Sequence, residues 1–251
     1  MQEDARVYWL AVETQAVEHG FLALPGDGGP HPGVVLIPDV RGLYDHFREL
    51  AARLSREGFA VLAVDLYRRG GPPEITSPGV AMKWIAGLDD RAVLADLQSA
   101  VDFLGGHPAV AGLRVGITGF CMGGQYAILA ACTCTGVSAC APFYGMLAYA
   151  PGLDAAKKPR APLDAVRDLS CPLLGFYGAE DPLIPLDQVE AFRERVVASG
   201  QAAELRVYAG AGHAFMNDTQ PERHRPEAAA DAWPRLVAFL HEHLEAKGAP
   251  A

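Results

Sequence analysis

Short apolar-rich segments alternate with amphipathic segments of helical periodicity from residue 33 to residue 244. Strands that are buried on both faces, as in parallel sheets, are typically short and nearly continuous in apolar residues. Six segments have this character: 33–38, 59–65, 114–118, 137–141, 172–177 and 204–208. This alternation constrains the fold more than any other feature, because it predicts strands joined by crossover helices.

The intervening segments carry apolar residues at the spacing of one helix face. In 46–56 they stand at i, i+3, i+4 and i+7, and 91–105 shows a similar pattern: Phe47, Leu50, Ala51, Leu54 in the first and Leu94, Leu97, Val101, Leu104 in the second. Further helices are predicted over 186–197 and 227–244. Right-handed crossovers between such strands give a doubly wound, mostly parallel sheet flanked by helices. Residues 12–24 are expected to add an antiparallel pair at the sheet edge.

The chain shows neither an internal repeat nor a low-complexity linker. Its 251 residues fit one domain, which we predict to span 1–251. The irregular segment is 146–169, which is rich in Ala, Pro and Lys. It could form a short cap over a site or a surface loop, and we favour the loop.

The net charge is −9, and the basic residues form no block. A chain without a cationic patch is a poor candidate for binding nucleic acid or an anionic membrane surface. We recognise no signal peptide at the charged start of the chain and no apolar run long enough to span a bilayer. The five cysteines have neither zinc-site nor CxxC spacing, so we expect no metal and a reduced, cytoplasmic setting.

The strongest local signal is the segment Gly119-Phe-Cys121-Met-Gly123, which follows a predicted strand and begins a predicted helix. This is the nucleophile-elbow pattern with cysteine in place of serine. The glycines avoid collisions in a tight strand-to-helix turn, and the helix N-terminus favours a thiolate. The backbone N–H of Met122 can face a developing oxyanion. The alternative is a buried structural cysteine, which is how we interpret the other four: Cys132, Cys134, Cys140 and Cys171.

An acid and a histidine follow later strands. Asp181 comes just after the predicted strand 172–177 and is favoured over Glu180, although a turn aspartate is the alternative. His213 follows two glycines after the strand 204–208. The order nucleophile, acid, histidine is that of α/β-hydrolases, so the three residues predict a catalytic triad on a single-domain α/β-hydrolase fold.

Several motifs together resemble the dienelactone hydrolase family over about residues 33–244. They are the Gly-Phe-Cys-Met-Gly-Gly elbow, Val64-Asp-Leu-Tyr67, Phe143-Tyr144-Gly145, Gly178-Ala-Glu-Asp181 and Gly212-His213-Ala-Phe215. The resemblance implies hydrolysis of lactones or esters, as by carboxymethylenebutenolidases, through a Cys-His-Asp triad without a cofactor. It also implies an acid that contacts the resting cysteine: Asp39 stands where the family usually has a glutamate. The following N–H, that of Val40, would then complete the oxyanion hole. The alternative for Asp39 is a polar loop residue.

The family's type enzymes bind a substrate carboxylate through two arginines. One of those positions is Asn217 here. The other arginine lies shortly before a tryptophan that Trp84 resembles, and residues 75–83 of this chain contain no arginine. Arg41 or Lys83 could substitute. We expect Arg41, Trp84, Tyr144, Phe215 and Asn217 to contact substrate, and we expect a neutral or bulkier ester or lactone.

These observations predict a cysteine-dependent hydrolase of carboxylic esters or lactones that forms a thioester acyl-enzyme. Activated esters and enol lactones are favoured over amides. Two alternatives stay open: a non-catalytic small-molecule-binding protein on the same fold, and an acyltransferase. The sequence leaves the natural substrate and the oligomeric state open.

Overall fold

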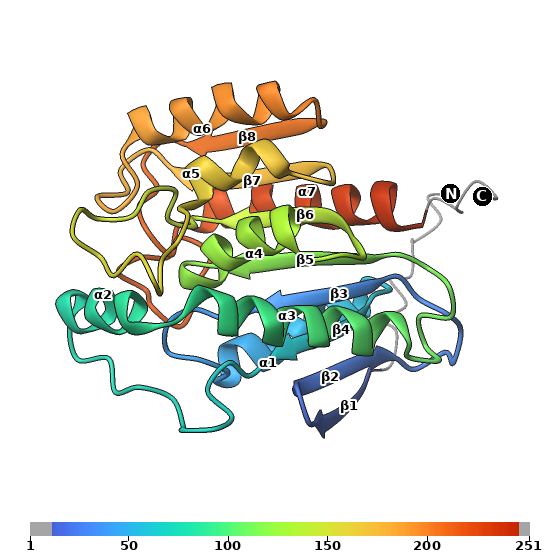
Figure 1. Ribbon diagram of the computed structural model, residues 1–251. Helices are drawn as coiled ribbons and strands as arrows, with labels where there is room; N and C mark the ends of the chain where they lie inside the picture. The colour runs from blue at the N-terminus through green and yellow to red at the C-terminus, as the bar shows by residue number, and fades with distance from the viewer. Residues whose placement is uncertain (1–11, 246–251) are drawn as a thin grey trace.

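An eight-stranded sheet forms the centre of the computed structural model, which describes residues 12–245 (Figure 1). The strand order is β1-β2-β4-β3-β5-β6-β7-β8. The strands are β1 (Val12–Val17), β2 (Gly20–Pro25), β3 (Gly33–Ile37), β4 (Ala60–Val64), β5 (Val115–Phe120), β6 (Val137–Phe143), β7 (Leu173–Gly178) and β8 (Ala203–Tyr208). Each of the six predicted strands is therefore present.

Parallel pairing joins β4, β3, β5, β6, β7 and β8, whereas β1 and β2 pair antiparallel at one edge. The predicted antiparallel pair at the sheet edge is confirmed. Strands β3, β4, β5 and β7 are buried along their whole length. This burial explains their nearly continuous apolar sequence, because helices cover both faces of a parallel sheet.

Helices flank the sheet on two sides, as predicted for a doubly wound fold. Helices α1 (Asp45–Arg56) and α7 (Pro226–Leu244) pack on one face. Helices α3 (Asp90–Gly105), α4 (Met122–Thr133) and α6 (Leu186–Ser199) lie on the other face (Figure 1). Helix α1 buries the stripe of Phe47, Leu50, Ala51 and Leu54 that its periodicity indicated. Among the helices of residues 12–245, none combines the length and the hydropathy required for a membrane span.

Helix α2 (Pro78–Gly87) was not predicted from the sequence. The Ser77 hydroxyl accepts a hydrogen bond from the Val80 N–H at 3.3 Å and caps the helix, and Pro78 occupies its first turn. The helix is short and apolar on more than one side, so its periodicity is weak. It lies beyond the carboxyl ends of the parallel strands, at the end of the sheet where the arrowheads of β3 and β5 point (Figure 1).

The segment 146–169 is irregular except for two short helical turns, α5 (Pro162–Ala165) and η1 (Val166–Asp168). A buried ion pair anchors it: Lys158 Nζ lies 2.6 Å from Oδ1 of Asp90, the first residue of α3. The hydroxyls of Tyr126 and Tyr149 also donate to that carboxylate, at 2.8 and 2.6 Å. The segment is therefore a loop fastened onto α3 and α4, which agrees with the interpretation we favoured.

Candidate active site

Cys121 stands between the end of β5 and the start of α4, with φ +57° and ψ −117°. Positive φ is unusual for a residue with a side chain and marks a strained backbone that the surroundings hold in place. The turn is so tight that a Cβ on Gly119 would lie 2.1 Å from the Gly123 carbonyl oxygen. A Cβ on Gly123 would lie 2.1 Å from the Ile37 carbonyl oxygen. The two elbow glycines therefore allow the turn to form, and the turn presents Cys121 at the helix N-terminus.

The imidazole of His213 is oriented by Asp181. Its Nδ1 lies 2.8 Å from Asp181 Oδ2, and the two side chains are 10% and 1% exposed. The acid is held in turn by the Leu183 N–H, which donates to its Oδ1 at 2.9 Å. The other nitrogen, Nε2, is buried and finds no hydrogen-bond partner within residues 12–245. His213 thus has one nitrogen engaged by a carboxylate and the other available for chemistry.

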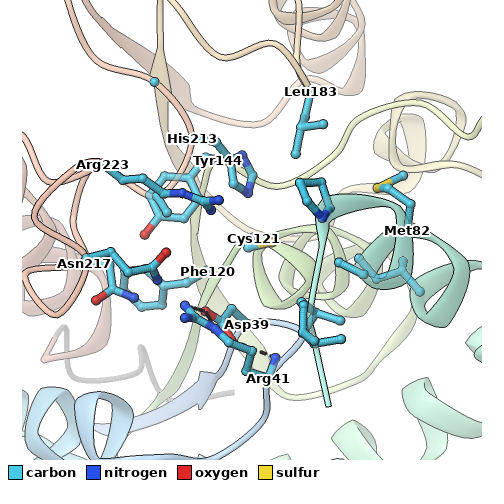
Figure 2. Close-up of a pocket in the computed structure, with 18 of the residues that line it drawn as sticks. Asp39, Arg41, Met82, Phe120, Cys121, Tyr144, Leu183, His213, Asn217 and Arg223 are labelled. Atoms are coloured by element: carbon cyan, nitrogen blue, oxygen red, sulfur yellow. Dashed lines mark hydrogen bonds and ion pairs between the residues drawn. The ribbon is translucent and has the colours of Figure 1, made fainter. Parts of the chain in front are cut away.

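Burial lowers the pKa of His213, but the electrostatic influence of Cys121 and the hydrogen bond to Asp181 together outweigh burial and raise it to about 10. These two neighbours therefore favour the imidazolium form. Figure 2 shows the imidazole and Cys121 facing the same cavity, which both residues line.

Two backbone N–H groups flank the cysteine. One belongs to Met122, the first residue of α4, and the other to Val40 in the turn after β3. The turn is closed by the Gly42 N–H, which donates to the Asp39 carbonyl at 2.9 Å. Within residues 12–245 neither the Val40 N–H nor the Met122 N–H is engaged in a hydrogen bond. Both are therefore free to bind an oxygen that develops negative charge.

The Asp39 carboxylate is directed toward Arg41 and Tyr44. It accepts from the Arg41 backbone N–H at 2.8 Å, from Arg41 Nη2 at 2.6 Å and from the Tyr44 hydroxyl at 3.2 Å. In the part of the chain that the structure describes, no hydrogen bond joins Asp39 to Cys121. The aspartate, one methylene shorter than glutamate, is paired with the neighbouring guanidinium.

Asn217 lines the cavity, but its amide is used within the protein. Nδ2 donates to the Tyr44 hydroxyl at 2.9 Å, and Oδ1 accepts from the Thr219 N–H at 3.0 Å and its hydroxyl at 2.6 Å. Arg41 Nη2 also donates to the Tyr44 hydroxyl, at 2.8 Å. Tyr44 therefore links Asp39, Arg41 and Asn217 into one network.

The cavity beside Cys121 has a volume of about 550 Å³ and two chemically different walls. Figure 2 shows Met82 and Leu183 on one side of the cysteine and Asn217 and Arg223 on the other. The apolar wall comprises Ile75, Pro78, Ala81, Met82, Ile85, Pro182 and Leu183; the polar wall comprises Arg41, Asn217, Gln220, Glu222, Arg223 and Arg225.

Among the predicted substrate contacts, Arg41, Tyr144 and Asn217 line this cavity, whereas Trp84 and Phe215 do not. Trp84 is 43% exposed on α2 and places its ring against Tyr67, with ring centroids 6.3 Å apart. Phe215 is fully buried behind Tyr144, with centroids 5.3 Å apart. Trp84 turns away because α2 directs another face at the cavity.

The sequence analysis missed that face of α2. The apolar residues Pro78, Ala81, Met82 and Ile85 stand at i, i+3, i+4 and i+7, but other apolar residues of α2, such as Val80 and Trp84, obscure this stripe in the sequence. Arg223 and Arg225, by contrast, lie in a turn-rich segment before α7 and carry no such pattern. Within residues 12–245, no group of three or more His, Cys, Asp or Glu side chains is placed to hold a metal ion.

Comparison with known proteins agrees with this geometry. The profile of the Dienelactone hydrolase family matches residues 19–244. A relative from Bradyrhizobium, described as a "Probable 2-oxo-3-(5-oxofuran-2-ylidene)propanoate lactonase", is 35% identical over 237 residues, which are 94% of each chain. A "Putative carboxymethylenebutenolidase" of Escherichia coli K12 is 32% identical over 244 residues, covering 91% of this chain and 88% of that one.

Among solved structures, the "Putative Dienelactone Hydrolase" of Klebsiella pneumoniae is 33% identical and superposes with a TM-score of 0.83. The match covers 93% of this chain and 99% of that chain. These matches extend over nearly the whole molecule, and the range of the family match spans the elbow, the acid turn and the histidine loop. The chain therefore belongs to the dienelactone hydrolase family and is a lactone or ester hydrolase of the α/β-hydrolase fold.

Proposed function

We propose that Cys121 is the nucleophile of a carboxylic ester or lactone hydrolase and that His213 and Asp181 serve it as base and orienting acid. One observation carries the proposal. The His213 imidazole has its Nδ1 held by Asp181 at 2.8 Å, while its Nε2 is buried without a partner in residues 12–245 and shares the cavity with Cys121. A nucleophile, a base and an orienting third group are the parts that covalent acyl transfer needs.

In the first half-reaction, the Cys121 thiolate attacks the carbonyl carbon of the substrate and a carbon–sulfur bond forms. The carbonyl oxygen becomes an oxyanion, which the N–H groups of Val40 and Met122 would hold. When the intermediate collapses, the carbon–oxygen bond to the alcohol breaks. The leaving oxygen takes the proton from the His213 imidazolium, and a thioester remains on Cys121.

In the second half-reaction, neutral His213 removes a proton from water as the water attacks the thioester carbonyl. The second tetrahedral intermediate expels the thiolate and releases the carboxylic acid. The sum is ester plus water to acid plus alcohol, and both catalytic groups return to their starting protonation states. No cofactor enters this scheme. The scheme needs a reduced thiol, so we infer a cytoplasmic location.

The setting of Cys121 differs from that of the other four thiols. Burial raises the pKa of Cys132 and Cys171 to about 12, that of Cys134 to about 11, and that of Cys140 well above its ordinary value. These thiols stay protonated at neutral pH, and a protonated thiol is a poor nucleophile. Cys121 is part-exposed at a helix N-terminus beside a histidine, which is the environment of a reactive cysteine.

The two walls of the cavity suggest the class of substrate. The apolar wall on α2 and the 182–183 turn can receive an alkyl or aryl group, and the polar wall can receive an oxygen-rich one. The Bradyrhizobium relative is named for a lactone that also carries a carboxylate. We propose a small activated ester or enol lactone with an apolar portion as the substrate of this chain.

The test is to trap and locate the nucleophile. p-Nitrophenyl acetate should release a burst of one equivalent of p-nitrophenolate, and mass spectrometry should place the acetyl group on Cys121. Iodoacetamide should abolish activity with alkylation at the same residue. Cys121→Ala and His213→Ala should each lower turnover by about a thousandfold or more. Cys132→Ala is the matched control, since Cys132 is the other part-exposed cysteine, and it should keep full activity.

Acylation at a residue other than Cys121, or turnover that survives in Cys121→Ala, would refute the proposal. Tight ligand binding without any turnover would favour the binding-protein alternative. Capture of the acyl group by an added alcohol or amine in preference to water would indicate an acyltransferase.

A further inference from the structure

The hydroxyl of Tyr67 contacts Val40 and Met122, the two residues whose backbone N–H groups are candidates for the oxyanion hole. Tyr67 Oη donates to the Val40 carbonyl oxygen at 3.1 Å and lies 3.5 Å from Met122 Sδ. One side chain therefore contacts both residues whose backbone N–H groups flank Cys121. Within residues 12–245, the Tyr67 hydroxyl is the hydrogen-bond donor found for the Val40 carbonyl.

We propose that Tyr67 is the positioning residue of the oxyanion hole; this inference rests on the proposed function. The carbonyl and the N–H of Val40 belong to the two peptide groups that meet at one Cα. Restraining the carbonyl fixes the Val40–Arg41 peptide. This limits how far the adjoining Asp39–Val40 peptide, which carries the Val40 N–H, can move within the turn. The oxygen of the substrate would meet that N–H only while the turn after β3 keeps this orientation.

The position of Tyr67 is itself fixed by backbone hydrogen bonds and by burial. Its N–H donates to Asp65 Oδ1 at 2.9 Å, and its carbonyl accepts from the Gly71 N–H at 2.7 Å. The side chain is only 6% exposed. Burial raises the pKa of the Tyr67 hydroxyl well above its ordinary value, so the group keeps its proton and remains a donor at every working pH.

The ring of Tyr67 supports the same turn from the side. Gly42 has φ +82°, and a Cβ at that position would lie 2.8 Å from ring carbon Cδ2 of Tyr67. The backbone of the turn therefore rests directly on the ring while the hydroxyl holds the Val40 carbonyl. This arrangement gives a physical role to the segment Val64-Asp-Leu-Tyr67, which the triad alone leaves unexplained.

Tyr67→Phe keeps the ring and removes the hydroxyl. The buried Val40 carbonyl then loses its donor, the turn after β3 loses that restraint, and the Val40 N–H is held less precisely toward the oxyanion. Acylation should fall about ten- to a hundredfold, somewhat less than the loss of a whole oxyanion-hole donor. Alkylation by iodoacetamide should stay within about twofold, since the thiolate displaces iodide from a saturated carbon and no oxyanion forms.

The experiment compares two rate constants on the full chain: the stopped-flow burst with p-nitrophenyl acetate and the inactivation by iodoacetamide. Tyr177→Phe is the matched control, because Tyr177 is a buried tyrosine whose hydroxyl has no partner in residues 12–245. Slow acylation with normal alkylation in Tyr67→Phe, and normal values for both in Tyr177→Phe, are expected. Unchanged acylation, or an equal fall in both rates, would overturn the role assigned to Tyr67.

Gly42→Ala perturbs the same contact from the side of the turn. It provides a second test in case the Tyr67→Phe variant does not fold. Its methyl group would press on the Tyr67 ring, so acylation should again fall while alkylation holds. A normal acylation rate in a folded Gly42→Ala variant would count against the proposal. A wild-type chain that shows neither a burst nor inactivation would overturn the proposed function itself, and the role of Tyr67 with it.

Discussion

Arg41 Nη2 lies 2.6 Å from Asp39 Oδ2, and both residues line the cavity beside Cys121. The Arg41 side chain is 34% exposed and that of Asp39 is 9% exposed, so the pair is only partly screened by solvent. Arg41 thus balances a charge of the protein itself. This pairing decides what the arginine can offer a substrate, because a guanidinium already held by a carboxylate attracts a second one less strongly.

We therefore expect neutral aryl esters or lactones to be hydrolysed with a kcat/KM at least equal to that for carboxylate-bearing dienelactones. Arg41→Ala should lower kcat/KM for neutral and anionic substrates by the same factor, because it leaves Asp39 uncompensated near the developing oxyanion. Side-by-side kinetics measure both values. Arg48→Ala is the control: Arg48 is an exposed residue of α1, paired with Asp45 outside the cavity. A preference for the anionic lactone that disappears selectively in Arg41→Ala would show that Arg41 binds the substrate carboxylate.

The pKa of His213 should depend on Cys121. In the wild type it is raised to about 10, although burial alone lowers it. Cys121→Ala removes the influence of Cys121 that raises the pKa of His213, so the opposing effect of burial is offset less and this pKa should fall. The raised value contributes stability that is fully present below the unfolded pKa of about 6.5 and is lost as pH rises through the folded value. NMR titration of the imidazole in both proteins measures the difference. Equal pKa values would contradict the ion-pair description.

The apolar wall of the cavity should set the preference for the length of the acyl or alcohol chain. Met82→Glu places a charge against that wall and should lower kcat/KM for p-nitrophenyl hexanoate more than for the acetate, by about tenfold or more. Lys83→Glu introduces the same side chain at the next position of α2, outside the cavity lining, and serves as the control. A chain-length series on the three proteins provides the measurement. Equal losses for short and long esters would show that substrates bind elsewhere.

The buried pair of Lys158 and Asp90 should contribute strongly to stability. The two side chains are 1% and 2% exposed, and Nζ lies 2.6 Å from Oδ1. Lys158→Met leaves the carboxylate buried without its cation, which should cost about 3–5 kcal/mol in the free energy of unfolding. Lys157→Met, at the exposed neighbouring position, should cost about 0.5 kcal/mol or less. Urea unfolding measures both. A loss below about 1 kcal/mol for Lys158→Met would show that the loop 146–169 is not fastened by this pair.

The sequence by itself determined the strands, most of the long helices and the order of the candidate catalytic motifs. Helices cover both faces of strands β3, β4, β5 and β7. Each of these strands is therefore a local run of mostly apolar residues, which can be recognised in the sequence. The elbow around Cys121 is likewise local, because glycines two residues either side are needed for the turn itself. Asp181 and His213 each follow a strand, and parallel strands bring their carboxyl ends to one edge of the sheet.

Only the tertiary structure decided which groups those side chains meet. Asn217 reaches Tyr44 across 173 residues of sequence, and Lys158 reaches Asp90 across 68. No local sequence pattern predicts either contact. Trp84 and Met82 stand two residues apart on α2, yet Met82 lines the cavity and Trp84 does not. The direction of a helix face is set by packing against distant elements. For this reason the sequence predicted the grouping of Cys121, Asp181 and His213 better than it predicted the lining of the cavity.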